Sequence, residues 1–139
     1  MRVAVIDGQG GGIGRLLVEK LRKEIPNLEI LALGTNSIAT TVMLKAGADK
    51  GATGEHAIVW NAPRVDIIIG AIGVVAGGSM MGELSDAMAI AVSHSDARKI
   101  LIPLEKCSLE IVGITKGTPI PLLIDAAVEA VKSYESMSR

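Results

Sequence analysis

Glycines cluster directly after the first apolar run of the chain. Five of the seven residues from position 8 to 14 are glycine, and an amphipathic stretch follows them. Glycine lets a backbone turn tightly and approach a ligand closely, and a helix that begins there offers unbonded N–H groups at the positive end of its dipole. This arrangement favours binding of a phosphate; the alternative is a connector that needs glycine only for helix–strand packing. The predicted phosphate-binding residues are Gly8, Gln9, Gly10, Gly11, Gly12, Ile13 and Gly14.

The spacing of these glycines and the residue before them refine the prediction. Gly8, Gly12 and Gly14 fit G-x-x-x-G-x-G, whereas Ile13 stands where G-x-G-x-x-G has its third glycine. Asp7 would repel an anion unless its carboxylate points away. We expect this carboxylate to accept N–H groups of the turn, and a magnesium-mediated contact is the alternative. The sequence assigns no resident metal.

The end of the second predicted strand lacks the residue that normally selects a dinucleotide. In NAD-binding domains an acidic side chain there bonds the ribose hydroxyls. Here the residues are Gly34, Thr35, Asn36 and Ser37, with no carboxylate for NAD and no arginine for NADP. We expect Gly34, Thr35 and Asn36 to contact ribose or a 2′-phosphate, and helix capping is an equally weighted alternative.

A second glycine segment follows the third clear strand. Its candidate cofactor-binding residues, which would let a ligand lie against the strand end, are Gly70, Ala71, Ile72 and Gly73. The next loop, 77–79, reads Gly-Gly-Ser and is a candidate for a second phosphate contact. We expect Met80 and Met81, which are adaptable apolar side chains, to contact a partner subunit.

The sequence contains no convincing set of catalytic residues. It has neither the G-x-x-x-x-G-K-[ST] signature of P-loop NTPases nor a nucleophile elbow. The only tyrosine, Tyr134, is followed four residues later by Ser138, where a short-chain dehydrogenase requires lysine. We interpret His94 as a solvated residue after a helix and Cys107 as an inert residue near a strand. The catalytic residues are therefore unknown, and whether the chain is an enzyme stays open.

Hydrophobic periodicity predicts the elements that position these segments. Short continuous apolar runs predict strands over 3–6, 28–33, 65–69, 100–102 and 110–114, and a short weak strand or a turn is expected near 48–52. Amphipathic or capped stretches predict helices over 13–25, 38–46, 55–61, 85–92 and 122–134, and Ser85 is the expected cap of the fourth. Strands without alternation, separated by helices, indicate a parallel sheet covered on both faces. The fold class is therefore α/β: a three-layer, doubly wound, mainly parallel and Rossmann-like sheet in one nucleotide-binding domain, residues 1–139.

Composition limits the partners and the compartment. The 139 residues carry 14 basic and 15 acidic side chains, and only 1% are aromatic, so the sequence favours neither nucleic acid nor a membrane surface. A single cysteine and the absence of a signal peptide or spanning segment predict a cytoplasmic protein. The hydrophobic share of 49% favours a homo-oligomer.

Four segments carry a resemblance to known families: 7–14, 32–36, 45–49 and 100–104. Together they resemble a family of short bacterial proteins of unknown function, which implies a Rossmann-like domain and no known activity. The spacing of the first turn is more distantly similar to short-chain dehydrogenases. The order of the glycine turn, the Asn36 region and the 77–79 loop is similar to the nucleotide half of tubulin-like GTPases.

Three functions are consistent with these patterns. The first is a non-catalytic or sensing module that binds NAD(P) or another purine nucleotide as a small-molecule ligand. The second is an oxidoreductase or nucleotide hydrolase whose chemistry a partner subunit completes. The third is a structural or interaction domain without a ligand. We rank the first highest because no acid, base or nucleophile stands out.

Overall fold

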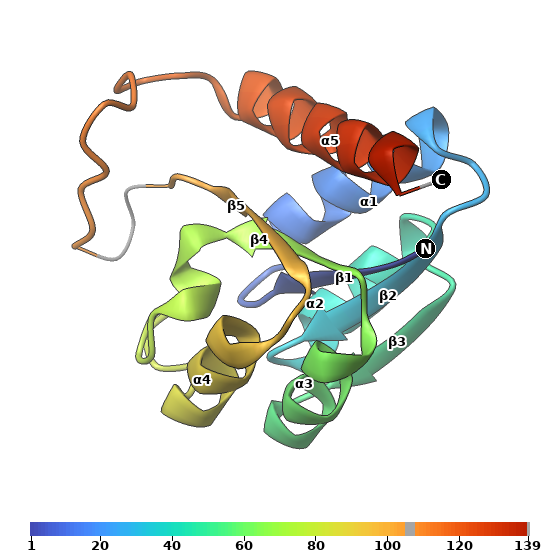
Figure 1. The fold of residues 1–139 in the computed structure, drawn as a ribbon. Coiled ribbons are helices and arrows are strands. Elements are labelled where there is room, and N and C mark those ends of the chain that lie inside the picture. The colour runs from blue at the N-terminus through green and yellow to red at the C-terminus, as the bar shows by residue number, and fades with distance from the viewer. Residues whose placement is uncertain (105–107, 139) are drawn as a thin grey trace.

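Five parallel strands form the centre of the molecule in the computed structural model, which describes residues 1–104 and 108–138 (Figure 1). Their order across the sheet is β3-β2-β1-β4-β5, and every neighbouring pair is parallel. The strands are β1 (Arg2–Asp7), β2 (Glu29–Gly34), β3 (Lys50–Thr53), β4 (Ile67–Ala71) and β5 (Arg98–Ile102). The predicted parallel α/β sheet is confirmed, and of the two alternatives near 48–52, a weak strand or a turn, the structure has the strand β3.

Helices cover both faces of the sheet and complete three layers. One face carries α1 (Gly12–Glu24), α2 (Ser37–Lys45) and α5 (Ile120–Met137), which share a hydrophobic core with the sheet. The other face carries α3 (Glu55–Asn61) and α4 (Asp86–His94), which pack on a second core (Figure 1). Two short 3-10 helices, η1 (Ala62–Arg64) and η2 (Ile72–Val75), flank β4. This is the doubly wound arrangement that the sequence predicts.

The sequence explains why these elements form where they do. Five of the six residues of β1 are buried, as expected for a central strand covered on both faces. In α1 the buried apolar residues Leu17, Val18 and Leu21 recur at helical spacing. The side chain of Ser85 caps α4 by accepting the N–H group of Met88, as predicted for that position.

The predicted strand over 110–114 is wrong. Residues 108–119 contain neither helix nor strand, and Val112 in their middle is 93% exposed. Gly113 interrupts the apolar run with a φ of 92°, a turn conformation that breaks strand geometry. A short β-branched run predicts a strand from local preference alone, and here no neighbouring strand pairs with it.

Two further observations complete the outline. The last helix begins at Ile120, directly after Pro119, and so starts earlier than predicted. Within the described ranges, no helix combines the length and apolar character that a membrane crossing requires. The prediction for Cys107 lies outside the described residues.

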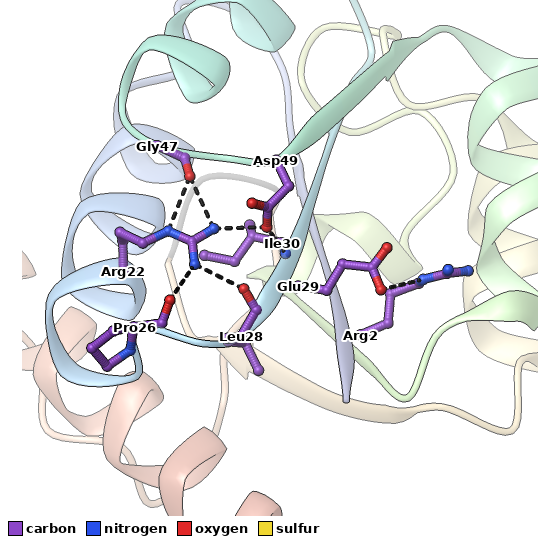
Figure 2. A network of polar contacts seen from close by, with 8 residues as sticks. All are labelled: Arg2, Arg22, Pro26, Leu28, Glu29, Ile30, Gly47 and Asp49. Atoms are coloured by element: carbon purple, nitrogen blue, oxygen red, sulfur yellow. Dashed lines mark hydrogen bonds and ion pairs between the residues drawn. The ribbon is translucent and has the colours of Figure 1, made fainter.

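A network around Arg22 joins α1 to both loops at the amino ends of β2 and β3 (Figure 2). The Arg22 guanidinium donates to the carbonyls of Gly47, Pro26 and Leu28 and to the carboxylate of Asp49. Asp49 also accepts the N–H of Ile30 at 2.8 Å. This network fixes the edge of the sheet that lies opposite the glycine turn.

Candidate functional site

A cavity lies at the carboxyl edge of the sheet, where the strand order changes direction. The chain leaves β1 toward α1 on one face and leaves β4 toward η2 and α4 on the other, so a crevice opens between the two strand ends. The cavity has a volume of about 290 Å³, close to the lower limit for small-molecule sites. Its lining residues are Asp7, Gly8, Gln9, Ile13, Ala71, Gly73, Met80, Met81 and Leu104.

At three glycines of the turn a side chain would overlap with neighbouring protein atoms. A Cβ on Gly8 would lie 2.3 Å from Oγ1 of Thr35, and one on Gly14 would lie 2.5 Å from Sδ of Met43. Gly11 has a φ of 74° and would place a Cβ 2.9 Å from the backbone of Ala39. Packing within the protein, the alternative to phosphate binding, therefore explains the glycines at Gly8, Gly11 and Gly14.

Gly10 and Gly12 are different, because nothing in the protein occupies the space that a side chain would fill. A Cβ on either residue would meet no atom within 4 Å, and neither residue has a positive φ. Within the part of the chain that the structure describes, the N–H groups of Gly10, Gly12 and Ile13 donate no hydrogen bond. Three donors at the start of α1 are thus available to an anion.

The Asp7 carboxylate joins the end of β1 to the start of α1. Its two oxygens accept the N–H of Gly8 at 2.8 Å and the N–H of Gly14 at 2.6 Å. Asp7 is 8% exposed, so this negative charge is largely withdrawn from the surface of the turn. The expected contact with the turn amides is confirmed.

At the end of β2 the protein's own carboxylate occupies the predicted ribose site. Oε1 of Glu83 accepts the N–H of Gln9 at 2.8 Å, the hydroxyl of Thr35 at 2.7 Å and the amide of Asn36 at 2.8 Å. These donors hold the pKa of Glu83 below its ordinary value, with the Gln9 N–H as the largest cause. Glu83 therefore stays ionised at neutral pH.

Asn36 links three parts of this region. Its side-chain oxygen accepts the N–H of Ala39 and caps α2, which confirms the capping alternative. Its side-chain NH₂ donates to the carbonyl of Gln9 as well as to Glu83. The hydrogen-bonding groups of the Asn36 side chain are therefore engaged within the protein.

The segment after β4 contributes part of the cavity wall. Ala71, the last residue of β4, and Gly73, in η2, line the cavity, whereas Ile72, also in η2, does not line it. Gly70 is required by packing, because a Cβ there would lie 2.6 Å from the carbonyl oxygen of Ile6. Gly34 is likewise required, since a Cβ would lie 2.2 Å from Oγ1 of Thr40.

The loop from 76 to 85 folds back on itself beside the turn. The buried hydroxyl of Ser79 donates to the carbonyl of Gly73 at 2.6 Å, and the N–H of Gly78 donates to the carbonyl of Leu84 at 2.8 Å. Met80 and Met81 have φ angles of 57° and 56°, which side-chain-bearing residues rarely adopt. This conformation places Met80 over Gly8 and leaves Met81 95% exposed.

Other candidate residues lie apart from the cavity. His94 is the exposed last residue of α4, and Tyr134 lies in α5 near Arg98. Among the described residues, no three His, Cys, Asp or Glu side chains come together as a metal-binding group.

Sequence reasoning missed Glu83 and Leu104. Glu83 ends a long uncharged stretch, but no spacing pattern links it to Thr35, which lies 48 residues earlier. Leu104 follows the end of β5, and only the strand order brings it beside β4 and the turn. Both residues lie at the site only because the fold brings together segments that are far apart in the sequence.

Comparison with known proteins identifies a family. No curated protein matches this sequence. Among solved structures, the chain is similar to a dodecameric FMN-dependent UbiX-like decarboxylase from Escherichia coli O157:H7, at 19% identity and a TM-score of 0.49, over 95% of this chain and 77% of that one. Residues 2–136 match the domain of unknown function DUF3842, and the chain therefore belongs to that family, as its resemblance to proteins of unknown function predicts.

Proposed function

We propose that this domain binds a nucleotide, with a phosphate on the N–H groups of Gly10, Gly12 and Ile13. The observation that carries the proposal is a pair of glycines that the fold does not require, beside unbonded amides at a helix N-terminus. Free backbone donors and a favourable dipole are what a phosphate needs, and a side chain on Gly10 or Gly12 would cover them. The rest of the ligand then occupies the adjoining cavity.

The cavity wall suits the remainder of a nucleotide. Ile13, Met80, Met81 and Leu104 supply apolar surface for a flat base or ring system, and the polar backbone of the turn lies opposite. Among the described lining residues, Asp7 is the only titratable side chain, and two backbone amides hold it. This favours a binding or sensing module over a catalyst.

A thermal-shift series tests the proposal. Wild-type protein is melted with FMN, AMP, ADP, GTP, NAD and NADPH, and a ligand at a hundred times its Kd should add about 2.7 kcal/mol of stability. In Gly12→Leu the shift should disappear while the unliganded protein stays folded, because that side chain points into open space. Ala126→Leu, which adds a similar bulk on the exposed side of α5, should keep the shift.

Two results would overturn the proposal. The first is an unchanged melting temperature of the wild-type protein with every nucleotide in the series. The second is a nucleotide shift that persists in Gly12→Leu, because the phosphate would then lie elsewhere.

We also propose that the domain associates with a second copy of itself. Met81 and Val112 are 95% and 93% exposed, and Leu122 is 57% exposed, an unusual exposure for large apolar side chains. Light scattering coupled to size exclusion should give a mass of at least twice 14.4 kDa. A monomer at micromolar concentration would contradict this.

A further inference from the structure

The crevice at the carboxyl edge has two sides, and only one of them is open. In dinucleotide-binding domains of this class, the ligand crosses the glycine turn and places one ribose at the end of the second strand. Here the cavity extends from the turn toward the ends of β4 and β5. The end of β2, by contrast, is bonded to Glu83 through Thr35 and Asn36.

The surface of Gly8 is covered as well. A Cβ added at Gly8 would lie 2.3 Å from Oγ1 of Thr35, 2.8 Å from Sδ of Met80 and 3.0 Å from Oε1 of Glu83. Side-chain atoms of Thr35, Met80 and Glu83 therefore fill the space beside the Cα of Gly8, between the turn and the end of β2.

Buried groups hold the covering loop in position. Leu84, next to Glu83, is 0% exposed, and its N–H donates to the carbonyl of Ser79. The Ser79 hydroxyl in turn donates to the carbonyl of Gly73 in η2, directly after β4. Glu83 thus comes from a loop that is anchored on both sides of the carboxylate, and it acts as a fixed wall of the site.

We infer that Glu83 and Met80 close the β2 side of the crevice, so that the site takes mononucleotides and excludes dinucleotides such as NAD(P). The inference rests on the proposed function and narrows its ligand class. Glu83 is then the residue that determines specificity, by occupying the position of a dinucleotide's ribose and by placing a negative charge there. The lowered pKa of Glu83 keeps that charge in place at neutral pH.

Titration calorimetry with paired ligands tests the inference. FMN and FAD share the flavin and its phosphate, and AMP and NAD share the adenosine phosphate, so each pair differs in the second nucleotide half. The wild-type protein should bind at least one mononucleotide at least about tenfold more tightly than its dinucleotide partner. Glu83→Ala removes the carboxylate and should raise the affinity for the dinucleotide. The ratio of mononucleotide to dinucleotide affinity should therefore be smaller in this variant than in the wild type.

Glu83→Gln serves as the matched variant. Its amide oxygen can still accept from Gln9, Thr35 and Asn36, so the wall stays in place and most of the discrimination should remain. If Glu83→Ala does not fold, the inference is tested by the ratio of mononucleotide to dinucleotide affinity in the wild type and in Glu83→Gln.

The outcomes separate the two proposals. Equal or tighter dinucleotide binding by the wild type overturns the inference and leaves nucleotide binding intact. The inference is also overturned if folded Glu83→Ala loses affinity for the mononucleotide. It is likewise overturned if the ratio of mononucleotide to dinucleotide affinity is the same in Glu83→Ala as in the wild type. A wild-type protein that binds none of the four ligands, nor any other nucleotide, overturns the proposed function and the inference together.

Discussion

Two carboxylates at opposite ends of the sheet, Asp49 and Glu83, differ in the groups that bind their negative charge. At the amino ends of the strands, Asp49 accepts from Arg22 at 2.7 Å and from the N–H of Ile30 at 2.8 Å (Figure 2). At the carboxyl ends, Glu83 accepts only from uncharged donors, the nearest being the Thr35 hydroxyl at 2.7 Å. Within the described residues, no lysine or arginine forms an ion pair with Glu83.

The difference lies in how the negative charge is balanced. In the Asp49 network the Arg22 guanidinium balances the negative charge of the carboxylate, and the pair joins the loops before β2 and β3. The Glu83 network leaves one negative charge beside the glycine turn, and under the proposed function this charge repels the second phosphate of a dinucleotide. We therefore expect changes in the first network to alter stability, and changes in the second to alter which ligand is admitted.

Removing Arg22 should have the largest effect. Arg22→Ala removes the guanidinium donor from three carbonyls and leaves Asp49 with only the Ile30 N–H among the described donors, so we expect the free energy of unfolding to fall by about 2 to 4 kcal/mol. Arg15→Ala is the control, because exposed Arg15 pairs with Glu19 alone among the residues that the structure describes, and the substitution should cost less than about 1 kcal/mol. Urea unfolding measures both variants, and equal losses would contradict the assigned role of Arg22.

The glycines of the turn should separate into two classes. Gly8→Ala forces a Cβ into Thr35 and Met80 and should destabilise the fold by about 1 to 3 kcal/mol. Gly10→Ala meets no atom within 4 Å and should leave the stability of the unliganded protein unchanged or raise it by about 0.4 to 1 kcal/mol. Thermal melts of the two variants give the comparison, and a destabilised Gly10→Ala would remove the argument that Gly10 is kept for a ligand.

Acid should weaken both carboxylate networks by a smaller amount. The pKa of Asp49 is lowered, mainly by the Ile30 N–H and then by Arg22, and the pKa of Glu83 is lowered by the Gln9 N–H first. A carboxyl whose folded pKa lies below its unfolded pKa stabilises the fold above the unfolded value, near pH 4, and that contribution disappears as pH falls through the folded value. The effect is modest because solvent screens both groups.

The pH profile can be assigned to each network by substitution. Stability measured from pH 7 to pH 3 should fall less steeply in Asp49→Asn and Glu83→Gln than in the wild type. Glu129→Gln, on the exposed side of α5, is the control and should follow the wild-type curve. Parallel curves for all four proteins would show that neither carboxylate couples protonation to folding.

Much of the architecture was predictable because its signals are local. Continuous apolar runs and helical spacing indicated β1, β2, β4 and β5 and the helices between them, and Asp7 and Ser85 formed their expected contacts. The strand predicted over 110–114 failed because strand formation also requires a neighbour to pair with, which a local pattern does not report.

The amino-acid sequence by itself determined the parallel sheet, the glycine turn and the helix that begins there, since burial periodicity and glycine conformational freedom act over a few neighbouring residues. Only the tertiary structure decided which glycines the fold requires, and that Glu83 reaches Thr35 across 48 residues. Strand order brings those loops to one edge, and strand order depends on packing of the whole chain. The shape of the site, and therefore its proposed ligand class, arises from that packing.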